Sequence, residues 1–173
     1  LDVPREKLES SSFIRQAKSL ESSGDYSGAV TFYEKAFQAW PDNGKLAKKI
    51  ANVSLARLGL NAKSAHYGKI ASRLLPRDTE VALQTALSLA NLEKVKEAQG
   101  YFDLAVSDDR PSRYALSSYA AFSEQNQSYD MALSLLARYE ELYGTSLESM
   151  VSKARILDQT GNVAMASEEY RTI

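Results

Sequence analysis

Hydrophobic and small residues recur along the chain with the spacing of amphipathic helices. Near the start, Phe13, Ala17 and Leu20 fall at positions i, i+4 and i+7, which places them on one face of a helix. Gly24 interrupts this pattern, and a second amphipathic stretch begins at Tyr26. The pattern predicts two consecutive helices joined by a short turn.

The same arrangement repeats with a period of about 34 residues. One series of small residues has steps of 34, 35, 34 and 34 residues and consists of Ala17, Ala51, Ala86, Ala120 and Ala154. A second, with steps of 35, 34, 34 and 34, consists of Ala29, Ser64, Ala98, Ala132 and Ala166. A third, with the same steps as the second, consists of Tyr33, Gly68, Phe102, Leu136 and Tyr170. Since helix propensity does not explain a shared period, the sequence predicts five helix pairs.

The turn positions follow the same period. They are occupied by Gly24, Gly59, Glu93, Gln127 and Gly161. Each series contains a single step of 35, which places one inserted residue between Ala51 and Gly59. We expect either a first helix that is one residue longer in the second unit or a looser turn after it.

The segment from Phe13 to Pro41 resembles the tetratricopeptide repeat. It carries residues typical of that family at Ala17, Leu20, Gly24, Asp25, Tyr26, Ala29, Tyr33, Ala36 and Pro41. The resemblance extends over about residues 10–173 and implies an all-α fold, a right-handed α-α superhelix (TPR solenoid) of about five antiparallel helix pairs. We predict an N-terminal lead-in over 1–9 and repeat units over 10–43, 44–78, 79–112, 113–146 and 147–173, the last of them truncated.

Later units depart from the family pattern in places. Ser64 and Gly68 stand where the family favours alanine and an aromatic residue, and Tyr139 stands where a small residue is usual. The turn of the third unit reads Glu93-Lys94-Val95 in place of Gly-Asp-Tyr. The family tolerates such departures, so the predicted fold does not depend on them.

Charge and composition exclude several classes of partner. Lys and Arg total 21 against 22 Asp and Glu, for a net charge of −1, which gives no global attraction to nucleic acid or to an anionic membrane. No apolar run approaches the roughly 20 residues that cross a bilayer, so we expect no direct membrane insertion of this fragment. The pattern indicates a soluble protein and leaves cytoplasmic and periplasmic locations open.

No group of residues points to catalysis, a metal or a cofactor. The chain has no cysteine and one histidine, His66, which we expect to be solvated. The adjacent carboxylates Glu140-Glu141 and Glu168-Glu169 point in different directions on a helix and are expected to form solvated faces. No glycine-rich phosphate loop or nucleophile elbow occurs, so we predict a protein that is not an enzyme and holds no cofactor.

The family resemblance implies a concave groove, lined by the first helix of each pair, that binds a peptide or a partner's helix. The predicted groove residues are Lys18, Lys45, Lys48, Asn52, Leu83, Leu87, Asn91, Tyr114, Ser117, Ala121 and Arg155. Ile14, Glu21, Leu55, Val151 and Asp158 share their register. The surface is basic in the first two units and apolar in the third, which suits a mixed peptide with an acidic portion. The alternative is that Leu83 and Leu87 pack against neighbouring helices.

These features predict a non-catalytic scaffold for protein–protein interaction whose partner is a protein or a peptide. A structural component of a larger complex, such as a bacterial envelope, pilus or secretion apparatus, is one alternative, and the regulatory arm of an enzyme is another. The chain opens at Leu1 and stops at Ile173 within an expected helix, which indicates a fragment of a longer chain. The uncapped ends could also be covered by an oligomer contact.

Overall fold

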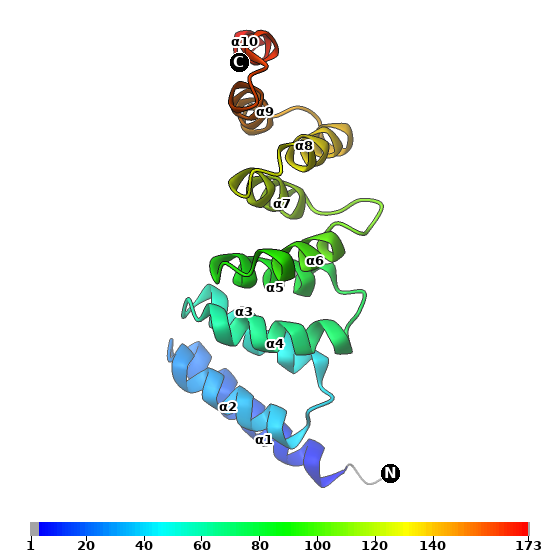
Figure 1. The fold of residues 1–173 in the computed structure, drawn as a ribbon. Helices are drawn as coiled ribbons and strands as arrows, with labels where there is room; N and C mark the ends of the chain where they lie inside the picture. The colour runs from blue at the N-terminus through cyan, green and yellow to red at the C-terminus, as the bar shows by residue number, and fades with distance from the viewer. Residues whose placement is uncertain (1–3, 173) are drawn as a thin grey trace. The chain divides into compact units, whose positions relative to one another are not determined.

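The structure, a computed structural model, describes residues 4–172, which form ten α-helices and no strand. The chain divides into two compact units, Leu1–Ala105 and Val106–Ile173. The helices of the first unit are α1 (Arg5–Ser22), α2 (Tyr26–Ala39), α3 (Gly44–Ala56), α4 (Asn61–Leu74), α5 (Thr79–Asn91) and α6 (Val95–Ala105) (Figure 1). Those of the second are α7 (Arg113–Gln125), α8 (Tyr129–Tyr143), α9 (Leu147–Gln159) and α10 (Val163–Thr172).

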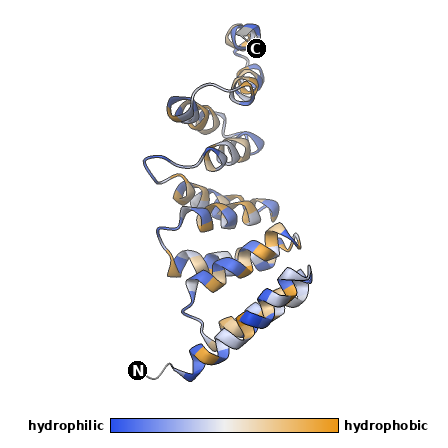
Figure 2. Ribbon diagram, turned by 180° about the vertical axis from the view of Figure 1, so that it is seen from behind, coloured by the Kyte–Doolittle hydropathy of each residue, from blue (hydrophilic) through white to orange (hydrophobic). Residues whose placement is uncertain are grey.

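Consecutive helices pack as five antiparallel pairs, α1 on α2, α3 on α4, α5 on α6, α7 on α8 and α9 on α10. Figure 2 shows apolar and polar residues on the same helices, as amphipathic packing requires. The predicted all-α fold of five helix pairs is confirmed. No helix among the described residues combines the length and the apolar character that a membrane crossing needs.

The periodic small residues are buried in both helices of every pair. The first series is 0–4% exposed and consists of Ala17, Ala51, Ala86, Ala120 and Ala154. The second series is 0–2% exposed and consists of Ala29, Ser64, Ala98, Ala132 and Ala166. Because two helices approach within about 8–10 Å only over small side chains, these residues set the spacing of each pair.

In the second helix pair, Ser64 and Gly68 of α4 contact the following helix, α5. Ser88 Oγ of α5 donates a hydrogen bond of 2.8 Å to Ser64 Oγ. A Cβ added at Gly68 would overlap Thr85 Oγ1 and lie 3.2 Å from Thr85 Cβ. The two departures from the family pattern therefore match each other, since both let α5 pack closely on α4.

Substitution of Gly68 by alanine tests this close contact. Alanine normally stabilises a helix interior, but overpacking against Thr85 should make Gly68→Ala destabilising by about 1–3 kcal/mol in urea unfolding. The penalty should shrink in a Thr85→Ala background, where the overlapping hydroxyl is gone. An equal penalty in both backgrounds would contradict the contact.

The turn inside each pair contains one residue with positive φ, at the position where the sequence places glycine in three units. The φ angles are 85° at Gly24, 63° at Gly59, 58° at Glu93, 58° at Gln127 and 80° at Gly161. The turn after α3 spans four residues, 57–60, whereas the other four span three. The inserted residue therefore loosens the turn, and α3 has the same 13 residues as α5, α7 and α9.

Glu93 and Gln127 carry a left-handed backbone that glycine adopts without strain. Gln127→Gly should therefore stabilise the protein by roughly 0.5–1 kcal/mol, after the entropic cost of glycine in the unfolded chain. The same change at Gln99, an exposed position within α6, should destabilise it by about 0.5–1 kcal/mol. Thermal unfolding of the two variants checks that the changes in stability have opposite signs. A loss of stability in both would contradict backbone strain at Gln127.

The first helix begins earlier than the predicted start of the first unit at residue 10. α1 begins at Arg5, after Pro4, and so includes part of the predicted lead-in over 1–9, of which residues 1–3 lie outside the described residues. The apolar pattern gave no signal here because residues 5–9 are exposed and Leu8 is 58% exposed. Lys7 Nζ lies 4.9 Å from the centroid of the Trp40 ring and attaches this first turn to the end of α2.

Candidate functional site

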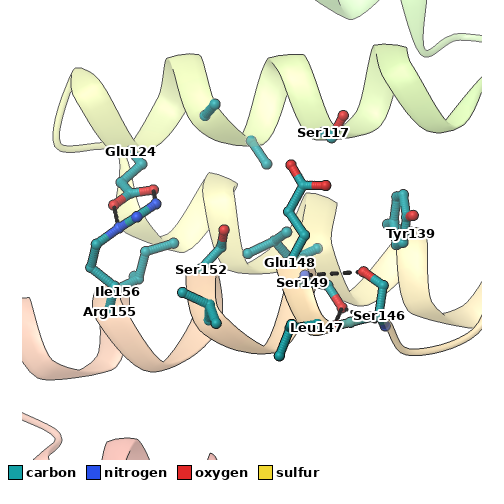
Figure 3. A pocket seen from close by; sticks show the side chains of 14 residues that line it. Ser117, Glu124, Tyr139, Ser146, Leu147, Glu148, Ser149, Ser152, Arg155 and Ile156 are labelled. Atoms are coloured by element: carbon teal, nitrogen blue, oxygen red, sulfur yellow. Dashed lines mark hydrogen bonds and ion pairs between the residues drawn. The ribbon is translucent and has the colours of Figure 1, made fainter. Parts of the chain in front are cut away.

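The second compact unit contains a cavity of about 530 Å³ between α7, α8 and α9 (Figure 3). Its lining comes from Ser117, Ala120, Ala121 and Glu124 of α7, Leu136 and Tyr139 of α8, and Ser146, Leu147, Glu148, Ser149, Val151, Ser152, Arg155 and Ile156 at the start and along the length of α9. Most of the surface is apolar, and serine hydroxyls and two carboxylates stand among the apolar groups. A volume of this size is in the range of ligand sites in proteins.

Tyr139 explains why α9 leaves room here. It is the eleventh residue of α8, and the eleventh residues of α2, α4 and α6 are Ala36, Ala71 and Ala105, each 0–1% exposed. Tyr139 lines the cavity, and its ring stacks obliquely on Tyr143 at 5.8 Å between centroids. Because a tyrosine ring fills space that alanine would leave to a neighbouring helix, the first turn of α9 cannot approach α8 as closely at this point.

An ion pair bridges α7 and α9 at one end of the cavity. Arg155 Nε and Nη2 donate to the two carboxylate oxygens of Glu124 at 2.5 and 2.8 Å (Figure 3). These hydrogen bonds to Glu124 raise the pKa of Arg155. A second hollow of about 500 Å³ lies beside the same pair and is lined by Ala121, Glu124, Gln125, Gln127, Tyr129, Arg155 and Gln159. The bridge therefore separates a mainly apolar cavity from a polar one.

Three of the predicted groove residues come together in this cavity, namely Ser117, Ala121 and Arg155, with Val151 of the same register. Tyr114 lies at the start of α7 and is 62% exposed, but it does not line the cavity. The remaining predicted residues lie on helices of the first compact unit, at Lys18, Lys45, Lys48, Asn52, Leu83, Leu87 and Asn91. Among these, Asn91 Nδ2 donates to Asn61 Oδ1 at 3.0 Å.

Two predicted groove residues have other roles. Leu83 is 7% exposed and belongs to the core, which agrees with the alternative that it packs against neighbouring helices and not with a place on the groove surface. Lys48 Nζ pairs with Asp78 at 2.9 Å and Glu80 at 2.5 Å. The neighbouring Lys49 pairs with Glu21 at 2.7 Å. Acidic residues of adjacent helices thus offset much of the basic character that was expected of this surface.

The electrostatics of these pairs follow from partial burial and hydrogen bonding. Burial alone would raise the pKa of Asp78, but hydrogen bonds from Lys48 Nζ and Val81 N, with the Lys48 charge, outweigh it and hold the pKa below its ordinary value of 3.8. Burial likewise would raise the pKa of Glu21, but hydrogen bonds from Lys49 and Tyr33 outweigh it and lower the pKa. Burial, with the hydrogen bond that Tyr33 donates to Glu21, raises the pKa of Tyr33.

The lowered pKa of Asp78 predicts an acid-dependent loss of stability. Its contribution is complete above the ordinary pKa of 3.8 and is lost as the pH falls through the lower folded-state value. Asp78→Asn keeps a side-chain cap for Val81 N but loses the ion pair, so it should cost roughly 0.5–1 kcal/mol at pH 7 and less at pH 2. Urea unfolding at both pH values checks this, with Asp42→Asn, at an exposed carboxylate of the same unit, as the control. A penalty for Asp78→Asn that does not change with pH would count against the pair.

The sequence placed the start of the last unit at residue 147, where α9 begins, but the predicted groove residues did not include the first turn of this helix, which supplies much of the cavity wall. Ser146 and Ser149 cap this helix reciprocally, with Ser149 N donating to Ser146 Oγ at 3.1 Å and Ser146 N to Ser149 Oγ at 3.0 Å. An available signal was the in-phase series of capping residues that precede the first helices, Asn43, Asp78, Ser112 and Ser146, with steps of 35, 34 and 34 residues. Polar N-caps locate helix starts directly.

The carboxylates that were expected to be solvated are partly engaged. Lys153 of α9 pairs with Glu140 at 3.0 Å and with Glu169 at 3.2 Å, and Ser149 Oγ donates to Glu140 at 2.8 Å. Glu140 therefore attaches α8 to α9 because its side chain faces that helix. His66 is exposed, as expected, and lies edge-on to the ring of Tyr67. No cluster of metal-ligating side chains occurs in the part of the chain that the structure describes.

The helix pairs, the buried small residues and the left-handed turns together define a tetratricopeptide-repeat fold. Solved structures bear this out. The chain is similar to the MamA protein, with a TM-score of 0.86 and 14% identity over 94% of this chain and 88% of that one. It is also similar to YrrB, described as a TPR protein with an unusual peptide-binding site, with a TM-score of 0.78 and 20% identity over 91% and 80% of the two chains.

A third similar structure is PilW, described as a widely conserved type IV pilus biogenesis factor. It matches with a TM-score of 0.67 and 20% identity over 94% of this chain and 74% of that one. No protein-family model matches the sequence, and no match was found among curated protein sequences. Identities this low establish the fold alone.

Proposed function

We propose that this chain is a protein-interaction scaffold and that it binds a peptide segment of its partner in the cavity between α7 and α9. The observation that carries the proposal is this mainly apolar cavity of about 530 Å³, which opens beside exposed apolar side chains of α9. Leu147 is 63% exposed and Val151 is 37% exposed. Exposed apolar groups around a preformed hollow are typical of interaction sites.

The rigidity of the cavity wall supports the same use. The capping box holds the first turn of α9, and the bidentate Glu124–Arg155 pair fixes its distance from α7. Both devices hold the wall through contacts within the protein, so binding would order few side chains and lose little conformational entropy. The peptide-binding site that the description of YrrB mentions, on the same fold, agrees with this proposal.

A substitution that fills the cavity tests the proposal. A peptide library displayed on phage should yield clones that bind the wild-type protein. Ala121→Trp should weaken their binding about tenfold or more, because the exposed Ala121 lines the cavity and its replacement occupies the volume. Fluorescence polarisation with the selected peptides measures the loss.

Ala137→Trp is the matched control, because Ala137 is exposed on α8 and does not line the cavity. Circular dichroism should show the same helical content for both variants. Selected peptides that bind the Ala121→Trp variant as tightly as the control would refute the proposed site.

A structural role in a larger assembly is the second candidate. One observation favours it: α10 exposes Val163 by 60%, Met165 by 58% and Tyr170 by 49%. Tyr170 continues the series of Tyr33, Phe102 and Leu136, each of which is at most 5% exposed. A surface of this kind would support association with a neighbouring protein, and such association would be unaffected by Ala121→Trp.

A further inference from the structure

We propose that the cavity between α7 and α9 selects a basic peptide, one that places a lysine or arginine beside apolar side chains. This inference rests on the proposed function and names the chemistry of the ligand. It stands on the charges that line the cavity and on the partners that those charges already have.

Three charged residues line the cavity, namely Glu124, Glu148 and Arg155. Glu124 and Arg155 satisfy each other through two hydrogen bonds, and Glu124 is only 13% exposed. Two N–H groups of the guanidinium thus bind one carboxylate, and the pair adds no net charge. The cavity as a whole has a charge of −1, which resides on Glu148.

Glu148 is placed to meet a ligand. It is the second residue of α9, and its side chain projects across the cavity toward α7, in the direction of Ser117 (Figure 3). Among the described residues, it is the charged group of the cavity without an ion pair. The N-terminus of α9 favours a carboxylate at this position, because the positive end of the helix dipole lies beside it.

The surroundings of Glu148 would strengthen a pair with a ligand cation. Leu147 and Val151 flank it on α9, and the fully buried Ile156 and the 5% exposed Leu136 form the apolar part of the wall. A peptide covering these groups would displace water from the carboxylate, and a Coulomb interaction is stronger at the lower effective dielectric constant that results. An uncharged or acidic ligand would instead leave the carboxylate desolvated and unpaired.

The sequence had suggested the opposite charge for the ligand. That expectation depended on lysines of the first units, and the structure gives Lys48 two acidic partners and Lys49 one. A carboxylate of a ligand would have to compete with these. The unpaired charge in the cavity favours a cationic ligand.

A change of charge at residue 148 tests the inference. The probe is a set of twelve-residue random peptides displayed on phage and selected on the wild-type protein and on Glu148→Lys in parallel. Wild-type selection should enrich lysine or arginine next to leucine, isoleucine or phenylalanine. Binding of these peptides should fall about tenfold or more in Glu148→Lys and by less in Glu148→Gln, and selection on Glu148→Lys should enrich aspartate or glutamate instead.

Glu141→Lys is the control, because Glu141 is exposed on α8 and lies outside the cavity lining. It should leave both affinity and selectivity unchanged. Ala121→Trp then separates the two possible failures. If selected peptides are acidic or uncharged and lose binding in Ala121→Trp, the inference is overturned and the proposed function stands. If no peptide is selected, or none depends on Ala121, the proposed function fails and the inference fails with it.

Discussion

The close crossing of paired helices over small buried side chains is the constraint on which the rest of this structure depends. Ala17, Ala51, Ala86, Ala120 and Ala154 are almost fully buried, and so are the small residues that recur with the same period in the second helix of each pair. A side chain larger by several methylene groups would separate the axes and break the spacing. The turns follow from this constraint, because a chain that reverses within three residues needs a left-handed backbone at one of them.

Departures from the repeat are informative because the rest of the pattern is so regular. Where an aromatic residue is usual, Gly68 brings α4 and α5 close together over Thr85. Where a small residue is usual, Tyr139 has the reverse effect, and a cavity lies beside it. Gly68 tightens one helix contact and Tyr139 loosens another. The same periodic framework therefore contains a dense region in one compact unit and a hollow in the other.

The fold could be predicted from the sequence because the buried positions repeat and every repetition adds to the signal. The period located the crossings, the turns and the inserted residue before Gly59. The site was harder to predict, because it depends on contacts between unlike residues that occur once. Helical register placed Ser117, Ala121 and Arg155 on one face, but it could not show that Glu124 binds Arg155 or that Leu83 is buried. Ion pairs between helices neutralise charges that the sequence alone presents as available to a ligand.

This pairing also decides which surface can discriminate between ligands. A charge already satisfied within the protein contributes little to recognition, since a ligand must first displace its partner. Lys48, Lys49 and Arg155 are all in this position. Glu148 differs, because the helix terminus stabilises its carboxylate without supplying a cation, and the apolar wall around it penalises any ligand that leaves it unpaired. A peptide bound as proposed would therefore be selected as much by rejection of acidic ligands as by attraction of basic ones.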